Sequence, residues 1–231
     1  MNNTKPCMKI TLTDTKPSIF ESKIGGTGYI PHDKDFPTDS NGNQLRLLAQ
    51  IECDKIQLDG FMKTGLLQFW VMNDDVAGME WDDQTKQDGF RVIYYPEIDM
   101  TVTKDEIESK FVKNEFDDDD MLPVLRECGM SFEKSEDSYI DYDEIEDDDE
   151  ESWEINSSHK VGGYPYFTQS DPRDEKMLEY YDFLLFQLDT DYIDNEDVVM
   201  WGDSGVGNFF INSEKLKNQD FSDVLYNWDC C

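Results

Sequence analysis

The sequence reads Ser22-Lys23-Ile24-Gly25-Gly26-Thr27-Gly28-Tyr29-Ile30 near its N-terminus, and a similar stretch follows 137 positions later (160 minus 23) as His159-Lys160-Val161-Gly162-Gly163-Tyr164-Pro165-Tyr166-Phe167. Adjacent glycines allow the backbone to adopt positive φ, and the aromatic residue after each pair can cover the turn. The two stretches therefore predict two Gly-Gly turns of the same kind.

The similarity continues beyond these turns. Leu47-Leu48-Ala49-Gln50-Ile51-Glu52 corresponds to Leu184-Leu185-Phe186-Gln187-Leu188-Asp189 at the same offset, and residues 65–71 correspond to 205–211 at an offset of 140 (205 minus 65). Collinear blocks of this kind indicate an internal duplication. All four blocks are apolar and rich in strand-forming residues, so they predict buried or half-buried strands, and Phe90–Tyr95 predicts another.

Three short helices are also expected. Thr103 with Glu106 three residues later is typical of a capped helix start, residues 174–183 form a second candidate, and Asn212 or Ser213 can cap 214–218. We therefore predict an α+β fold, a single β-rich domain over 1–231. It would consist of two duplicated halves, 7–114 and 155–231, with an acidic insert at 115–154.

The charge balance limits the classes of partner. The chain has 53 acidic and 20 basic residues, a net charge of -33, with dense acidic runs at 117–120 and 147–151. Such runs do not pack against apolar side chains, so the insert is expected to be part helix and part mobile loop. A protein this acidic is not expected to bind nucleic acid or an anionic membrane surface, because both require clustered Lys and Arg.

The expected compartment is the cytoplasm. The first ten residues contain no apolar stretch of the kind found in a secretory signal, and no window approaches the ~18 apolar residues that would span a bilayer. The cysteines are odd in number and scattered, which favours reduced thiols over disulfides or a zinc site. They are Cys7, Cys53, Cys128, Cys230 and Cys231.

No catalytic residue is predicted. The chain has two histidines, His32 and His159, and neither lies in a motif of nucleophilic catalysis. The alternating carboxylates of a calcium-binding EF-hand loop are also missing from the sequence. We therefore expect no metal, no cofactor and, on balance, no enzymatic activity.

Six residues are candidates for ligand binding. Lys23 and Lys160 could form anion-cradling turns with their glycines, although a purely structural turn explains the same pattern. Gln50 and Gln187 would be buried amides that need partners, either backbone of the other half or a ligand. His159 is adjacent to Lys160. Asp203, in a Gly-Asp-Ser-Gly stretch found only in the second half, could orient Lys160 or a ligand, or simply form a turn.

These motifs carry a resemblance to a known family. The chain resembles the YwqG-like bacterial proteins of unknown function in six ordered motifs, at residues 22–31, 45–51, 65–70, 159–167, 184–189 and 201–211. The resemblance implies a single α+β domain with internal duplication and brings no established activity or catalytic residues. Relatives are associated with toxin-immunity gene neighbourhoods, which implies a role in binding and neutralising a toxin.

Three functional hypotheses follow. The first is a cytosolic binding protein, an immunity-type inhibitor whose acidic surface engages a basic partner such as a bacterial toxin. The alternative is a small-molecule-binding protein or enzyme with a pocket between the two halves, lined by Lys160, His159, Gln187 and Asp203. A third is an interaction scaffold whose acidic insert confers solubility. The sequence does not specify an oligomeric state.

Overall fold

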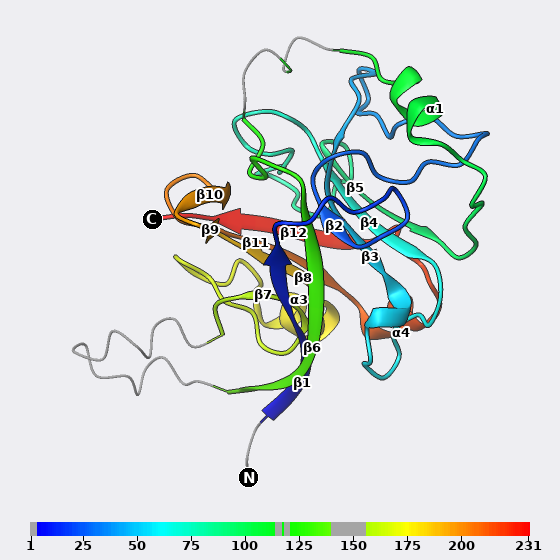
Figure 1. Cartoon of the computed structure of the whole chain (residues 1–231). Helices are drawn as coiled ribbons and strands as arrows, with labels where there is room; N and C mark the ends of the chain where they lie inside the picture. The colour runs from blue at the N-terminus through cyan, green and yellow to red at the C-terminus, as the bar shows by residue number, and fades with distance from the viewer. Residues whose placement is uncertain (1–3, 114–116, 118–120, 140–155) are drawn as a thin grey trace.

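The computed structural model describes residues 4–113, 117, 121–139 and 156–231 and is dominated by one ten-stranded sheet (Figure 1). The strands of this sheet are ordered β12-β11-β8-β7-β1-β6-β2-β3-β4-β5. Their bounds are β1 (Thr4–Thr13), β2 (Lys23–Ile24), β3 (Arg46–Glu52), β4 (Leu66–Val71), β5 (Phe90–Tyr95), β6 (Cys128–Ser138), β7 (His159–Gly162), β8 (Phe183–Asp189), β11 (Val206–Ile211) and β12 (Val224–Asp229).

The remaining elements are small. Strands β9 (Asp191–Ile193) and β10 (Glu196–Val199) form a separate two-stranded sheet. The described helices are α1 (Lys104–Ser109), α3 (Glu175–Tyr180), α4 (Ser213–Lys217) and the single 3-10 turn Cys53–Lys55.

Two long strands form the centre of the sheet. β1 and β6 pair antiparallel from Thr4 opposite Ser138 to Thr13 opposite Gly129. β6 also pairs with β2, and β1 also pairs with β7. We call β2, β3, β4 and β5 the first arm and β7, β8, β11 and β12 the second arm. The two arms curl toward each other into a nearly closed, barrel-like sheet.

The inner faces of the two arms share one hydrophobic core. Because side chains alternate along a strand, Phe69 and Phe90 of the first arm point inward and meet Phe186, Phe209 and Tyr226 of the second. The ring centroids of Phe69 and Phe186 are 4.7 Å apart, and Phe209 stacks on Tyr226 at 4.4 Å. This aromatic contact joins the arms into one body.

The sheet closes without a strand ladder between its two edges. The segment between β4 and β5 lies against β12: the carbonyl of Gln84 accepts from the backbone N–H of Tyr226 (2.9 Å), and the carbonyl of Val76 accepts from the indole of Trp228 (2.7 Å). The first of these bonds occupies a backbone N–H on the edge of β12 that would otherwise be open to pairing with another chain.

Most of the predicted elements are confirmed. The strands expected at 47–52, 65–71, 90–95, 184–189 and 205–211 are β3, β4, β5, β8 and β11 to within a residue. Thr103 and Asn212 cap α1 and α4 through their side chains, and α3 lies inside the range expected for it.

The predicted α+β class is wrong, because the described residues form mostly strands with three short helices. The division into two duplicated halves and an insert is not supported either. The segment 115–154 supplies β6 at the centre of the sheet, and β1 from the N-terminal part pairs with the second arm. β6 was missed because its alternating exposed face is charged and resembles solvated loop. Residues 118–120 and 147–151 lie outside the described residues.

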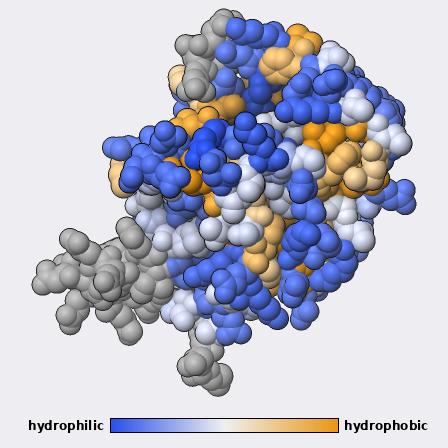
Figure 2. Space-filling model, viewed as in Figure 1, coloured by the Kyte–Doolittle hydropathy of each residue, from blue (hydrophilic) through white to orange (hydrophobic). Residues whose placement is uncertain are grey.

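The surface is mainly polar. Figure 2 shows a largely hydrophilic face on which the apolar patches are small and separated. None of the helices that the structure describes is long and apolar enough to cross a membrane.

Candidate functional site

The predicted site residues form two groups, one on each arm. Lys23 lies opposite Gln50 on β2 and β3, and Lys160 lies opposite Gln187 on β7 and β8. All four side chains are buried. The structure thus brings the predicted lysines and glutamines together in pairs but does not join them into a single site between the arms.

Lys160 is held by a carboxylate from β6. Its Nζ donates to Asp137 Oδ2 (2.6 Å) and to the carbonyl of Asn156 (2.7 Å), and neither charged side chain is exposed. Burial lowers the pKa of Lys160, and the nearby Asp137 carboxylate opposes that shift. Asp137 also accepts from the backbone N–H of Tyr164 (3.0 Å) and from the Cys7 thiol (3.4 Å).

The Gly-Gly motif is explained by this carboxylate. Gly163 has φ 77° and lies so close to Asp137 that a Cβ would be 2.1 Å from Oδ2. Gly26 of the first arm has φ 67°, and a Cβ there would be 2.3 Å from Glu127 Oε1, the partner of Lys23. The anion expected beside each Gly-Gly turn is therefore present as a carboxylate of the chain itself.

Gln187 fixes the loop that follows this turn. Its Oε1 accepts from the backbone N–H of Tyr166 (2.8 Å), and its Nε2 donates to the carbonyls of Asn156 (3.0 Å) and Ser158 (2.8 Å). These partners belong to the same arm and leave no hydrogen-bonding atom of the amide unused. Gln187 and Lys160 together position residues 156–166.

Lys23 and Gln50 position the corresponding loop of the first arm through similar hydrogen bonds. Lys23 Nζ donates to Glu127 Oε1 (2.7 Å) and to the carbonyls of Pro17 and Thr27, while burial lowers its pKa. Gln50 Oε1 accepts from the backbone N–H of Tyr29 (2.8 Å). The difference is that Glu127 is partly exposed, whereas Asp137 is buried.

His159 and Asp203 lie apart from these pairs. His159 Nδ1 accepts from the backbone N–H of Asp189 (3.0 Å), so its proton is on Nε2, which donates to Asp191 (3.1 Å). This bond lowers the pKa of Asp191. Asp203 is exposed in the turn before β11, and Lys160 takes Asp137 as its carboxylate partner instead.

The outer face of the first arm is covered. Trp70 donates its indole N–H to Gln68 Oε1 (3.0 Å), and Gln68 Nε2 donates to Gln50 Oε1 (2.7 Å). Side chains from the loops before β3 and around α1 pack over this layer. Its buried members are Ile19, Tyr29, Ile30, Leu45, Leu47, Leu66, Trp70, Met72, Val102 and Ile107.

The outer face of the second arm is covered less completely. Its buried cluster contains Tyr181, Leu184, Phe210 and Leu225. Above it lies a cavity of about 650 Å³, which we call the outer pocket. The volume is in the range that holds a small molecule. Its aromatic lining consists of Tyr139, Tyr164, Tyr166, Phe167 and Phe210.

Two cations line the outer pocket. Arg173 forms a bidentate pair with Asp171 (2.9 and 2.6 Å), and its guanidinium lies 3.7 Å from the ring centroid of Phe210. Lys5 Nζ lies 4.7 Å from the ring centroid of Tyr164 and has no ion pair within the described part of the chain. Partial burial and the charge of Arg173 lower the pKa of Lys5, and the charge of Asp182 opposes that shift.

An unsatisfied amide lies directly beneath the pocket. Asn208 Nδ2 donates to the carbonyl of Tyr166 (2.9 Å), but its buried Oδ1 has no hydrogen-bond partner in the part of the chain that the structure describes. Phe210 stands two residues further along β11, as Trp70 does after Gln68 on β4, and Phe210 has no N–H to donate. In the first arm the side-chain amides of Gln50 and Gln68 bond within the chain, whereas in the second arm the Asn208 acceptor is left unpaired among the described residues.

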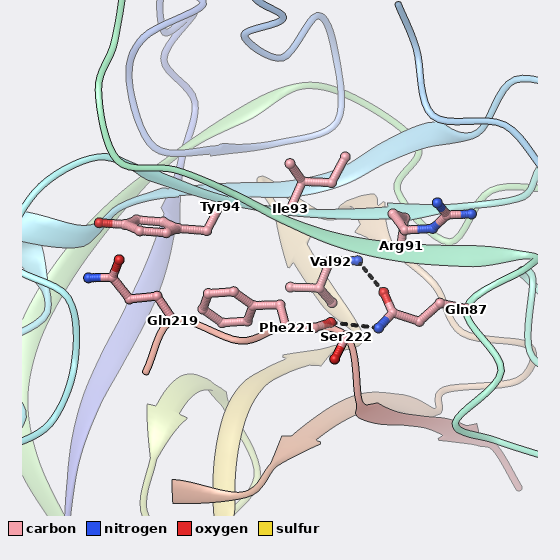
Figure 3. A pocket seen from close by; sticks show the side chains of 8 residues that line it. All are labelled: Gln87, Arg91, Val92, Ile93, Tyr94, Gln219, Phe221 and Ser222. Carbon is pink, nitrogen blue, oxygen red and sulfur yellow. Dashed lines mark hydrogen bonds between the residues drawn. The ribbon is translucent and has the colours of Figure 1, made fainter. Parts of the chain in front are cut away.

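A second cavity, of about 490 Å³, lies at the seam between the arms (Figure 3). There the Gln87 amide accepts from the backbone N–H of Val92 (3.0 Å) and donates to the carbonyl of Phe221 (2.7 Å). The amide thus bridges β5 and the loop before β12. This cavity is shallow and open, and its central polar group is already bonded at both ends, so we consider the outer pocket the better candidate site.

Sequence reasoning missed the residues that build the outer pocket. Asp137 was one carboxylate among many in an acidic segment, and Lys5 and Arg173 belong to no motif. The only available signal was the aromatic run Tyr164-Pro165-Tyr166-Phe167, which was interpreted as a cover for the turn.

The fold and the site define a mostly β, barrel-like domain with one aromatic-lined pocket on the outer face of its second arm. Among the described residues, no three His, Cys, Asp or Glu side chains are placed to hold a metal ion. The chain belongs to the family described as a domain of unknown function (DUF1963), whose model matches residues 22–230. Comparison with curated proteins gives no significant match.

Proposed function

We propose that the protein is a binding protein and that the outer pocket is its ligand site. One observation carries the proposal: the outer face of the second arm encloses about 650 Å³ lined by aromatic side chains and a lysine without a carboxylate partner in the described chain, whereas buried apolar side chains cover the outer face of the first arm. Ligand sites are typically concave and mostly apolar with a few polar groups, as this pocket is.

The supporting residues favour binding over catalysis. Lys160 and Gln187 are not among the residues that line the pocket, and their hydrogen bonds hold its loop in place, so the pocket is largely formed before a ligand arrives. Burial raises the pKa of the Cys7 thiol to about 11, which opposes its use as a nucleophile.

The test is a thermal-shift screen of a metabolite library against the wild type and two variants. Leu178→Trp places a large side chain at the pocket rim from the exposed face of α3, and Leu125→Trp is the control, since Leu125 is equally exposed (43% against 44%) and lies outside the pocket. We expect compounds that stabilise the wild type and Leu125→Trp but not Leu178→Trp. A screen in which no stabilising compound distinguishes these two variants would contradict the proposal.

A second candidate function rests on charge. With 53 acidic and 20 basic residues, the chain is suited to binding a basic protein, and we include in this proposal a YwqG-like, toxin-neutralising role in the cytoplasm. Partners recovered by pull-down at low salt would be purified and their affinities measured at several salt concentrations. Affinity should fall as salt rises; an affinity independent of salt would eliminate this candidate.

A further inference from the structure

Given the proposed function of the outer pocket, on which this inference rests, we propose that its ligand is a small carboxylate with a flat apolar body. The apolar body packs among the aromatic side chains of the lining, and the carboxylate lies at Lys5.

The polarity of the pocket changes from floor to rim. Leu184 and Phe210 are buried in the apolar cluster of the second arm. Lys5, Tyr139 and Leu178 are exposed at the other side of the cavity. A ligand that matches this gradient is amphipathic, with its apolar part inserted and its polar group near solvent.

The polar group is an anion because, of the charged side chains that line the cavity, Lys5 is the one with neither a hydrogen bond nor an ion pair within the described chain. The charge of Asp182 also acts on Lys5, but from beyond ion-pair distance. Asp171 is occupied by Arg173, and Asp182 accepts from both the backbone N–H (2.7 Å) and the hydroxyl (2.8 Å) of Ser213. Lys5 is the cation for which the described residues provide no carboxylate within ion-pair distance. By contrast, the buried Lys23 and Lys160 each have one.

A further donor lines the same cavity. The hydroxyl of Thr168 is buried and has no hydrogen-bond partner among the described residues, although the hydroxyl can donate as well as accept. A carboxylate has two oxygens and about four acceptor positions, so it can use an ammonium and a hydroxyl together. A cationic ligand would leave the hydroxyl usable only as an acceptor and would meet the charge of Lys5.

The apolar part is flat because the walls are aromatic. Tyr164, Tyr166, Phe167 and Phe210 border a cavity of about 650 Å³. Aromatic rings pack best against other rings in offset or edge-to-face arrangements, and those contacts stabilise a bound ring by about 0.5 to 1.5 kcal/mol each beyond its burial.

The test compares three probes that share a naphthyl ring: naphthylacetate, its amide and the corresponding naphthylethylamine. Their affinities for the full chain are measured by calorimetry at low salt. Charge-assisted hydrogen bonds are about twice as strong as neutral ones, so we expect the carboxylate to bind about five- to tenfold more tightly than the amide. The amine should bind more weakly than either.

Two variants assign the preference to Lys5. Lys5→Met should reduce the carboxylate to the affinity of the amide and leave the amide unchanged. Lys9 is an exposed lysine on the same strand and is not part of the pocket lining, so Lys9→Met should keep the full preference for the carboxylate over the amide. Raising the salt concentration should reduce the preference in the wild type, because the ammonium lies near solvent.

Three outcomes would overturn the inference: equal binding of the three probes, tightest binding of the amine, or no binding of the carboxylate. In each case the thermal-shift screen with Leu178→Trp decides the proposed function separately. Hits of another chemical class that Leu178→Trp abolishes would retain the pocket as a ligand site while rejecting carboxylates. A carboxylate preference that survives Lys5→Met would also overturn the inference.

Discussion

The two arms of the sheet share the same buried polar contacts but differ in how their outer faces are covered. In each arm a buried lysine pairs with a carboxylate from the region of β6, and a buried glutamine opposite that lysine binds the backbone of the following loop. Over the first arm, side chains of the loops and of α1 then pack into a buried apolar cluster. Over the second arm the buried cluster is smaller, and the outer pocket lies above it.

This difference separates the residues that support the fold in both arms from those that are available to bind a ligand in the second arm. A lysine and glutamine pair occurs in both arms, and the outer pocket lies over the second, so the pair alone does not indicate a ligand site. What distinguishes the second arm is the replacement of a Trp70 and Gln68 contact by Phe210 and Asn208, together with the unpaired Lys5. Variants made in both arms can test this distinction.

The largest expected effect is the loss of a buried cation. Lys160→Met leaves Asp137 buried without its countercharge, so we expect the free energy of unfolding to fall by about 3 to 5 kcal/mol. Lys23→Met should cost less, about 1 to 3 kcal/mol, because Glu127 is partly exposed and can be solvated. Urea denaturation of both variants measures the difference. Equal losses would mean that burial of the carboxylate is not what separates the arms.

Substitutions of Gln187 and Gln50 should have different effects on ligand binding in the outer pocket. Gln187→Leu and Gln50→Leu each remove bonds to buried backbone groups, and we expect both to lower the free energy of unfolding by about 2 to 4 kcal/mol. Only Gln187→Leu should also weaken ligand binding in the outer pocket, because it frees the loop at Tyr166. Calorimetry with the naphthyl probes checks this. A matching loss of binding in Gln50→Leu would show that the effect is global.

Substitutions of the neighbouring amides Gln68 and Asn208 should differ in how much they lower the free energy of unfolding. Gln68→Leu removes the acceptor of the Trp70 indole and donors to two buried oxygens, which should cost about 2 to 4 kcal/mol. Asn208→Leu removes one bond but also an unsatisfied acceptor, so we expect a cost of about 1 kcal/mol or less. Thermal unfolding distinguishes the two. A large loss in Asn208→Leu would reveal an additional partner of Oδ1.

The smallest effect is a pH dependence of the second arm. Burial raises the pKa of Cys7 from 9.0 to about 11, so between these pH values the folded state keeps a proton that the unfolded state loses. The contribution is therefore fully present below pH 9 and is lost as pH rises toward 11. Cys7→Ser should reduce this decline in unfolding free energy, whereas Cys230→Ser, at a less buried thiol, should not. An unchanged decline in Cys7→Ser would place its origin elsewhere.

Local sequence patterns predicted most of the strands and helices but not how the strands pair in the sheet. Apolar runs located β3, β4, β5, β8 and β11, and capping residues located α1 and α4, because these features depend on neighbours a few positions away. β6 escaped because its acidic, half-exposed sequence becomes a central strand only by pairing with β1, more than a hundred residues away. The predicted α+β class and insert failed for that reason.

From its local pattern alone, the sequence predicted that Gln50 and Gln187 would be buried amides in need of partners, since each lies in an apolar strand, and it placed Lys23 and Lys160 beside Gly-Gly turns. Only the tertiary structure decided what those partners are. Glu127 and Asp137 come from the region of β6, and Lys5, Tyr164 and Arg173 meet around one cavity. Pairing between distant strands sets these contacts, and the side chains that pack over each outer face set whether a cavity lies there.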